Sequence, residues 1–131
     1  MVSSSIFKWL SESIVVLPNC FKSQDWLIFN SKIVFSGAVE WGVRKSVKEI
    51  YTVDFDGHNL NKVTNHRGLA LSPAFSPDNQ KIIYSLIDST RRIKNVSLYE
   101  LDLQTGKSRI VSDKAGMNSG AIYSADGKGL Y

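Results

Sequence analysis

The chain has 131 residues, of which 43% are hydrophobic, and this is enough for one ordinary domain with a core. Its net charge of +4 is the small difference between 16 basic and 12 acidic residues, so neither a nucleic-acid partner nor a strongly charged surface is predicted. The single cysteine, Cys20, excludes an internal disulfide and a thiol-rich metal site, and no apolar run approaches the roughly 18 residues that a membrane-spanning helix needs.

The N-terminal part of the chain, residues 1–28, differs in pattern from the rest. The three serines at residues 3–5 are possible N-caps of a helix. Apolar residues then recur at helical spacing, namely Ile6, Trp9, Leu10 and Ile14. This spacing predicts a short amphipathic helix over about residues 5–15, which Pro18 ends. We therefore assign residues 1–28 to an N-terminal helix followed by an irregular connector.

From Lys32 onward the hydrophobic period changes from that of a helix to two, which is typical of β-strands. One full unit can be drawn, with strands predicted at residues 72–76, 81–86, 97–103 and 107–112. Dipeptides that favour tight hairpins separate the strands, for example Asp56-Gly57 and Asp126-Gly127. Neighbouring strands are therefore predicted to be antiparallel.

The most informative feature of the chain is an internal repeat of 48 or 49 residues. The segment PAFSPDNQKIIY (73–84) is repeated as AIYSADGKGLY (121–131), which aligns Ser76 with Ser124, and IYTVDFDG (50–57) is repeated as LYELDLQTG (98–106). KIVFS (32–36) likewise anticipates KIIYS (81–85). A repeat of this length built from strands and turns predicts stacked β-sheet units, with β-propeller blades as the leading candidate.

Three segments carry a resemblance to a known family: EIYTVDFDGHN (49–59), LALSPAFSPD (69–78) and GMNSGAIYSADGK (116–128). In this order and spacing they resemble the blades of the TolB family, the periplasmic β-propellers of the Tol-Pal system. The resemblance implies an all-β fold of four-stranded antiparallel blades. We expect a partial β-propeller at residues 29–131, divided into blades at about 32–70 and 71–118 and the start of a further blade at about 119–131.

The same resemblance implies a function and a place in the cell. TolB-family propellers are non-enzymatic, lie in the periplasm, and bind the peptidoglycan-associated lipoprotein Pal and other Tol proteins, which helps to maintain the outer membrane and its constriction during division. An alternative is the propeller that gates a prolyl-oligopeptidase-like serine peptidase, because the SPD-type turn occurs there as well. The family has a leader, an N-terminal domain and six blades, so we expect this chain to be a fragment. Residues 8–20 only partly resemble a secretory leader, and no working signal peptide is predicted.

Partner-binding residues are expected where the loops between blades converge on one mouth of a propeller. By resemblance, these candidates are His66, Arg67, Met117, Asn118 and Ser119. The alternative is that they are solvated loop residues without a partner. Arg91, Arg92 and Lys94 form a short basic cluster in another loop, and without interleaved aromatic residues this cluster favours a solvated loop over a nucleic-acid platform.

No enzymatic motif, metal site or cofactor is predicted. The chain contains no HExxH, CxxC or GxSxG, so no catalytic residue is assigned. Asp54, Asp56 and Asn59 resemble the start of a calcium loop, but the remaining ligands are missing, and a simple hairpin is the favoured interpretation.

A short array of blades has one further physical consequence. Each blade buries both of its faces against neighbours, and roughly three repeats are needed for an independent stack. Two blades would leave apolar faces open at both ends. We therefore expect self-association through open blade faces, or marginal folding.

Overall fold

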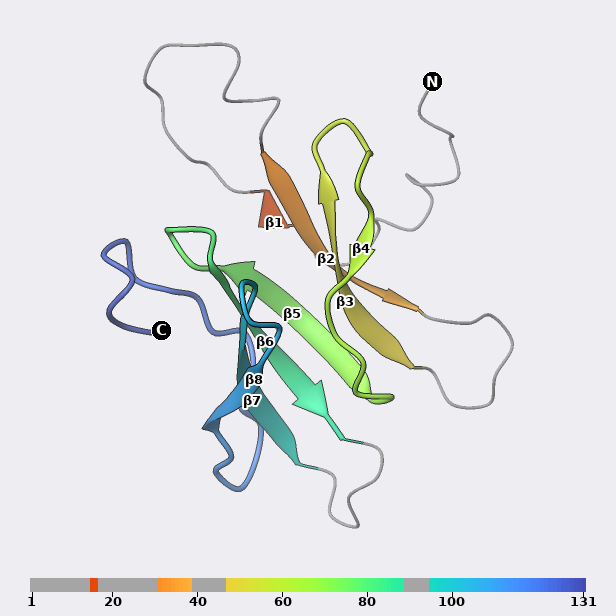
Figure 1. Ribbon diagram of the computed structural model, residues 1–131. Helices are drawn as coiled ribbons and strands as arrows, with labels where there is room; N and C mark the ends of the chain where they lie inside the picture. Colours follow the sequence, from red (N-terminus) through yellow and green to blue (C-terminus); the bar gives the residue numbers. More distant parts are fainter. Residues whose placement is uncertain (1–14, 17–30, 39–46, 89–94) are drawn as a thin grey trace.

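A computed structural model describes residues 15–16, 31–38, 47–88 and 95–131, and in these residues the chain is all-β (Figure 1). The first group of strands comprises β1 (Val15–Val16), β2 (Lys32–Ala38), β3 (Lys48–Asp54) and β4 (Asn61–Lys62). The second comprises β5 (Leu69–Phe75), β6 (Lys81–Ile87), β7 (Val96–Asp102) and β8 (Ser108–Ser112). The predicted all-β fold is confirmed. Within these ranges no helix is long and apolar enough to cross a membrane.

The strands follow a simple antiparallel order within each group. β1 pairs with β2, β2 with β3, and β3 with β4, and the second group repeats this order from β5 to β8. A single parallel pair, Lys48 with Leu69, joins β3 to β5. We refer to β1–β4 as the first blade and to β5–β8 as the second blade. Figure 1 shows the first blade above the second.

The second blade is buried on both faces, and its sequence explains why. β6 reads KIIYSLI, with five consecutive buried residues in its centre, instead of alternating apolar and polar residues. Such a run is suited to a strand that is covered on both sides. Ile82 and Tyr84 lie in a cluster shared with Val34 and Ile50 of the first blade. Ile83 lies in a second cluster on the opposite face, which the C-terminal segment covers with Ala121, Tyr123 and Leu130.

The repeat seen in the sequence is also present in the structure. Ser76 Oγ donates to Asp78 Oδ1 (2.5 Å) and accepts a hydrogen bond from the backbone N–H of Lys81 (2.9 Å). Forty-eight residues later, Ser124 Oγ donates to Asp126 Oδ1 (2.5 Å) and accepts one from the N–H of Gly129 (2.8 Å). Tyr123 pairs with Leu130 as Phe75 pairs with Ile82. Residues 121–131 therefore begin a third unit equivalent to β5 and β6.

Two predictions made from local pattern need correction. Val15, at the end of the predicted N-terminal helix, belongs to the two-residue strand β1, because its backbone pairs with Val34. Residues 5–14 of that helix lie outside the described residues. The inner strand of the second blade begins at Leu69 and not near Ser72. The turn-like residues Ser72 and Pro73 lie inside it, at a β-bulge where Ser72 has a φ of 50°.

Candidate functional site

One end of the blades is built from the starts of equivalent strands, and we refer to it as the rim. Lys48 at the start of β3 pairs with Leu69 at the start of β5. The bridge between Val96 and Met117 repeats this contact 48 residues further on. Among the described residues, two connections reach the rim: residues 64–68, the first rim loop, and residues 113–118, the second rim loop. They lie at the lower end in Figure 1. All five predicted partner-binding residues lie in these loops or next to them.

A buried carboxylate holds the first rim loop. Glu49, in β3, is 1% exposed. Its Oε2 accepts a hydrogen bond from Thr64 Oγ1 (2.5 Å), and its Oε1 accepts one from the backbone N–H of Arg67 (2.8 Å). Thr64 Oγ1 in turn accepts from the N–H of Ile50 (2.8 Å). These contacts fix the backbone between Thr64 and Gly68, and the side chain of Arg67 is exposed at the surface of the rim.

His66 lies between the blades. Its ring packs against Tyr84 and Tyr99 at centroid distances of 5.7 and 5.6 Å, and its Nε2 is 2.7 Å from the Tyr84 hydroxyl. The Tyr84 hydroxyl also contacts Ser108 Oγ (3.1 Å). Burial raises the pKa of Tyr84 to about 12, although the hydrogen bond to Ser108 acts in the opposite direction. The histidine therefore makes a half-buried packing contact between the first rim loop and the second blade.

The second rim loop is held by amide side chains. Asn118 Nδ2 donates to the carbonyl oxygens of Val96 and Lys114 (2.8 Å each), and its Oδ1 accepts from Ser112 Oγ (2.8 Å). Met117, in contrast, is 81% exposed. Ser119 is exposed as well. Arg67, Met117 and Ser119 are thus exposed at the rim, and the side chains of His66 and Asn118 hold the rim loops through the contacts given above.

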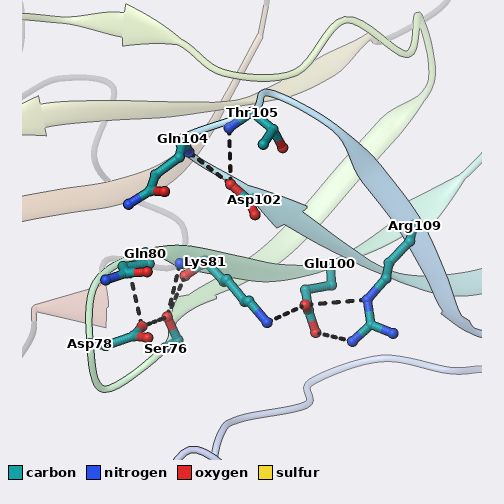
Figure 2. Close-up of polar contacts among 9 residues, drawn as sticks. All are labelled: Ser76, Asp78, Gln80, Lys81, Glu100, Asp102, Gln104, Thr105 and Arg109. Atoms are coloured by element: carbon teal, nitrogen blue, oxygen red, sulfur yellow. Dashed lines mark hydrogen bonds and ion pairs between the residues drawn. The ribbon is translucent and has the colours of Figure 1, made fainter.

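The opposite end of the second blade carries a charged cluster that the sequence analysis did not single out (Figure 2). Glu100, whose side chain is 7% exposed, lies 3.1 Å from Lys81 Nζ and 2.9 Å from Arg109 Nη2. Burial acts to raise the pKa of Glu100, but the hydrogen bonds from Arg109 and Lys81 outweigh it and hold this pKa below its ordinary value. A cavity of about 280 Å³ opens beside the cluster, with Tyr123 and Leu130 of the third unit in its wall.

Tyr123 borders this cavity with a buried hydroxyl that lies near the Glu100 carboxylate but has no partner with hydrogen-bond geometry among the described residues. Burial, together with the negative charge of Glu100, raises the pKa of this phenol. One signal in the sequence could have revealed the cluster. The alignment of residues 50–57 with 98–106 puts Glu100 at the position of Thr52. The strand register then places Arg109 opposite Glu100, as Asn61 lies opposite Thr52.

The segment that resembles a calcium loop forms a hairpin. Asp54 accepts hydrogen bonds from Lys32 Nζ (2.5 Å) and Asn59 Nδ2 (2.6 Å), and these contacts lower its pKa. Asp56 Oδ1 accepts from the N–H of His58 (3.0 Å). Across the described ranges no group of three or more His, Cys, Asp or Glu side chains is placed to hold a metal ion. The basic cluster Arg91, Arg92 and Lys94 lies outside those ranges.

Comparison with known proteins places these blades in a family. A family model described as the TolB beta propeller domain matches residues 24–131. The Tol-Pal system protein TolB of Rickettsia bellii (strain OSU 85-389) is 37% identical over 100 residues, which are 76% of this chain and 22% of that protein. The corresponding protein of Rickettsia canadensis (strain McKiel) is 38% identical over 100 residues, or 76% and 21% of the two chains. The chain thus spans about a fifth of the length of these relatives.

Solved structures agree with this assignment. TolB from Acinetobacter baumannii matches with a TM-score of 0.65 and 27% identity, covering 78% of this chain and 24% of that one. An oligogalacturonate lyase in complex with manganese matches with a TM-score of 0.54 at 15% identity, covering 88% and 28%, and this likeness shows the fold alone. The described residues are blades of a β-propeller. The chain belongs to the TolB beta propeller domain family.

Proposed function

We propose that this chain is a non-enzymatic protein-binding module of the Tol-Pal type, which acts in the periplasm and binds a Pal-like lipoprotein or another Tol protein. The proposal rests on the family assignment together with the rim, where repeated loops present different side chains on an equivalent frame. Loops of this kind on a rigid scaffold are common sites of recognition. In this proposal the partner-binding set is His66, Arg67, Met117, Asn118 and Ser119.

The five residues have different parts in the proposed site. Arg67 and Met117 offer a cation and a flexible apolar side chain to the partner, a pairing that suits an acidic surface with an apolar centre. Ser119 adds an exposed hydroxyl two residues after Met117. His66 and Asn118 act chiefly by holding the rim loops through their contacts with Tyr84 and Val96. The peptidase alternative is not favoured, because the curated relatives described above are TolB proteins.

The test is direct binding. The 131-residue chain and a full-length TolB would each be titrated by calorimetry with the soluble domain of a Pal-like lipoprotein. We expect the chain to bind, and Arg67→Ala or Met117→Ala to weaken binding about tenfold or more. The control is Gln104→Ala, an exposed substitution in the hairpin at the opposite end. If the lipoprotein bound full-length TolB but not this chain, the proposal would be abandoned.

We also propose, as part of the same interaction behaviour, that the chain self-associates through open blade faces. Ile122 and Tyr131 are 57% and 82% exposed. Their counterparts 48 residues earlier, Ala74 and Ile83, are buried in the second blade. Sedimentation velocity would measure the association, which we expect Ile122→Lys to reduce. A concentration-independent monomer would contradict it.

The domain boundaries at residues 28 and 29, and the blade limits near 70 and 118, are proposed on the same basis. Limited proteolysis followed by mass spectrometry would test them, because cleavage concentrates in exposed connections between compact units. Cleavage spread evenly over residues 29–131 would count against a compact pair of blades.

A further inference from the structure

We infer that Glu49 is a positioning residue, which fixes the backbone of the first rim loop so that Arg67 is held toward an acidic protein partner. This inference rests on the proposed function for the identity of the partner. Its structural part concerns only the chain itself and can be tested alone.

The first step is the cost of placing a carboxylate at this position. Glu49 is 1% exposed, and a buried charged group is unfavourable unless hydrogen bonds satisfy it. Each oxygen of the Glu49 carboxylate accepts a hydrogen bond from the first rim loop, one from the Thr64 hydroxyl and one from the Arg67 amide. Both oxygens of the Glu49 carboxylate therefore hydrogen-bond to the first rim loop.

The second step is the strained backbone that these hydrogen bonds hold. Arg67 has a φ of 54°, a left-handed conformation that is uncommon for residues other than glycine. Gly68 follows, and a Cβ on it would lie 2.6 Å from the carbonyl oxygen of Ile87, so the loop passes very close to the second blade. The N–H of Lys48 donates to the carbonyl of Gly68 (2.9 Å) and closes the other side. An arginine in this geometry needs an external constraint, and Glu49 supplies it.

The third step is the equivalent position in the second blade, where different residues constrain the loop. Ser97 stands 48 residues after Glu49, and its hydroxyl donates to the Asp113 carboxylate. In the second blade the strand therefore supplies the hydroxyl and the rim loop supplies the carboxylate, the reverse of Glu49 and Thr64. Asn95 Oδ1 accepts from the N–H of Gly116 (3.1 Å). In both blades, polar side chains at the start of this strand thus hydrogen-bond the adjacent rim loop. In the first blade this side chain is Glu49, and the loop that it holds contains Arg67 with its positive φ.

Trypsin reports on the loop without any partner, because it cleaves after Arg67. We expect Glu49→Gln to speed cleavage after Arg67 about tenfold relative to cleavage after the exposed Lys114 in the same molecule, because a neutral amide oxygen accepts the Arg67 N–H more weakly than a carboxylate oxygen does and the Thr64 hydroxyl would have to turn to accept from the amide N–H. The matched control is Glu100→Gln, the same change at a buried glutamate facing the opposite end. It should leave the Arg67 to Lys114 ratio unchanged. A ratio that rises equally in both variants, or in neither, would overturn the positioning role.

The same variants, titrated with the soluble domain of a Pal-like lipoprotein, test the link to binding. We expect Glu49→Gln and Arg67→Ala each to weaken binding about tenfold, and the double variant to lose little more, since both changes act on one side chain. Full additivity would contradict the inference. If the wild-type chain did not bind, the proposed function would fail, and the cleavage ratio would still decide the role of Glu49.

Discussion

The two contacts between successive units are equivalent in position but different in chemistry. Between the first and second blades, Val34 and Ile50 pack against Ile82 and Tyr84 in a continuous apolar cluster. Between the second blade and the third unit, the apolar cluster is smaller, and it lies beside the cavity that Glu100 and Arg109 help to line. Phe75 is 5% exposed in the first contact. Its counterpart in the second contact is Tyr123, whose hydroxyl makes no hydrogen bond with the part of the chain that the structure describes.

The difference shows how much chemistry one repeated frame tolerates. The backbone hydrogen bonds of the turns at Ser76 and Ser124 are the same, so the polar cluster has not altered the frame. The side chains that face the next unit differ between the two contacts, because the backbone does not determine whether these side chains are apolar or polar. The first contact should therefore contribute more to stability than the second.

The largest expected effect compares apolar truncations in the two contacts. Ile82→Ala removes a fully buried side chain and should lower the free energy of unfolding by about 3 kcal/mol. Leu130→Ala, at the equivalent position of the third unit, should cost about 1 kcal/mol, since Leu130 is only partly buried. Urea denaturation of the 131-residue chain measures both. Equal losses would mean that the second contact is as well packed as the first.

A smaller effect is expected from the serine of the repeated turn. Ser76 is 4% exposed, and Ser76→Ala would leave the N–H of Lys81 without the serine oxygen, at a cost of about 1.5 kcal/mol. Ser124→Ala removes the same hydrogen bond where water can replace it, and should cost about 0.5 kcal/mol or less. The comparison uses the same denaturation experiment. A larger loss at Ser124 would contradict the relative burial of the two turns.

Removing one hydroxyl from each contact should have opposite effects. Tyr84→Phe deletes an oxygen that contacts His66 and Ser108, and should destabilise the chain by about 1 kcal/mol. Tyr123→Phe deletes a buried oxygen that has no partner with hydrogen-bond geometry among the described residues and that lies near the Glu100 carboxylate, and it should stabilise the chain by about 0.5 kcal/mol. Thermal and urea denaturation would both register the sign. Destabilisation by Tyr123→Phe would mean that this hydroxyl is satisfied in solution.

Much of the frame could be predicted from the sequence, because strands, turns and repeats are local signals. The 48-residue repeat predicted the equivalence of Ser76 and Ser124, and residues 81–86 and 97–103 match β6 and β7 to within one residue at each end. The start of β5 could not be predicted in this way. Ser72 and Pro73 favour a turn locally, and only pairing with β6 makes this segment a strand with a bulge.

The candidate site was less predictable because its residues act through contacts between blades. The sequence placed His66 in a loop, and its packing on Tyr84 and Tyr99 depends on how the blades meet. The sequence singles out Glu49 only as the first residue of the segment 49–59 that carries the family resemblance, because nothing local connects it to Arg67, 18 residues away. Whether the five candidate residues bind a partner stays a prediction for the titrations described above.

The smallest expected effect is the pH dependence of the polar contact. Because the pKa of Glu100 is lowered from 4.5 in the folded chain, the folded state binds a proton at this site less readily than the unfolded state. Its contribution to stability is therefore present above about pH 4.5 and is lost as the pH falls through the folded pKa. Urea denaturation between about pH 3 and about pH 7 should give a shallower acid loss of stability for Glu100→Gln than for the wild-type chain. Parallel curves would show that Lys81 and Arg109 do not stabilise the carboxylate in solution, and the second contact would then be held by its apolar residues alone.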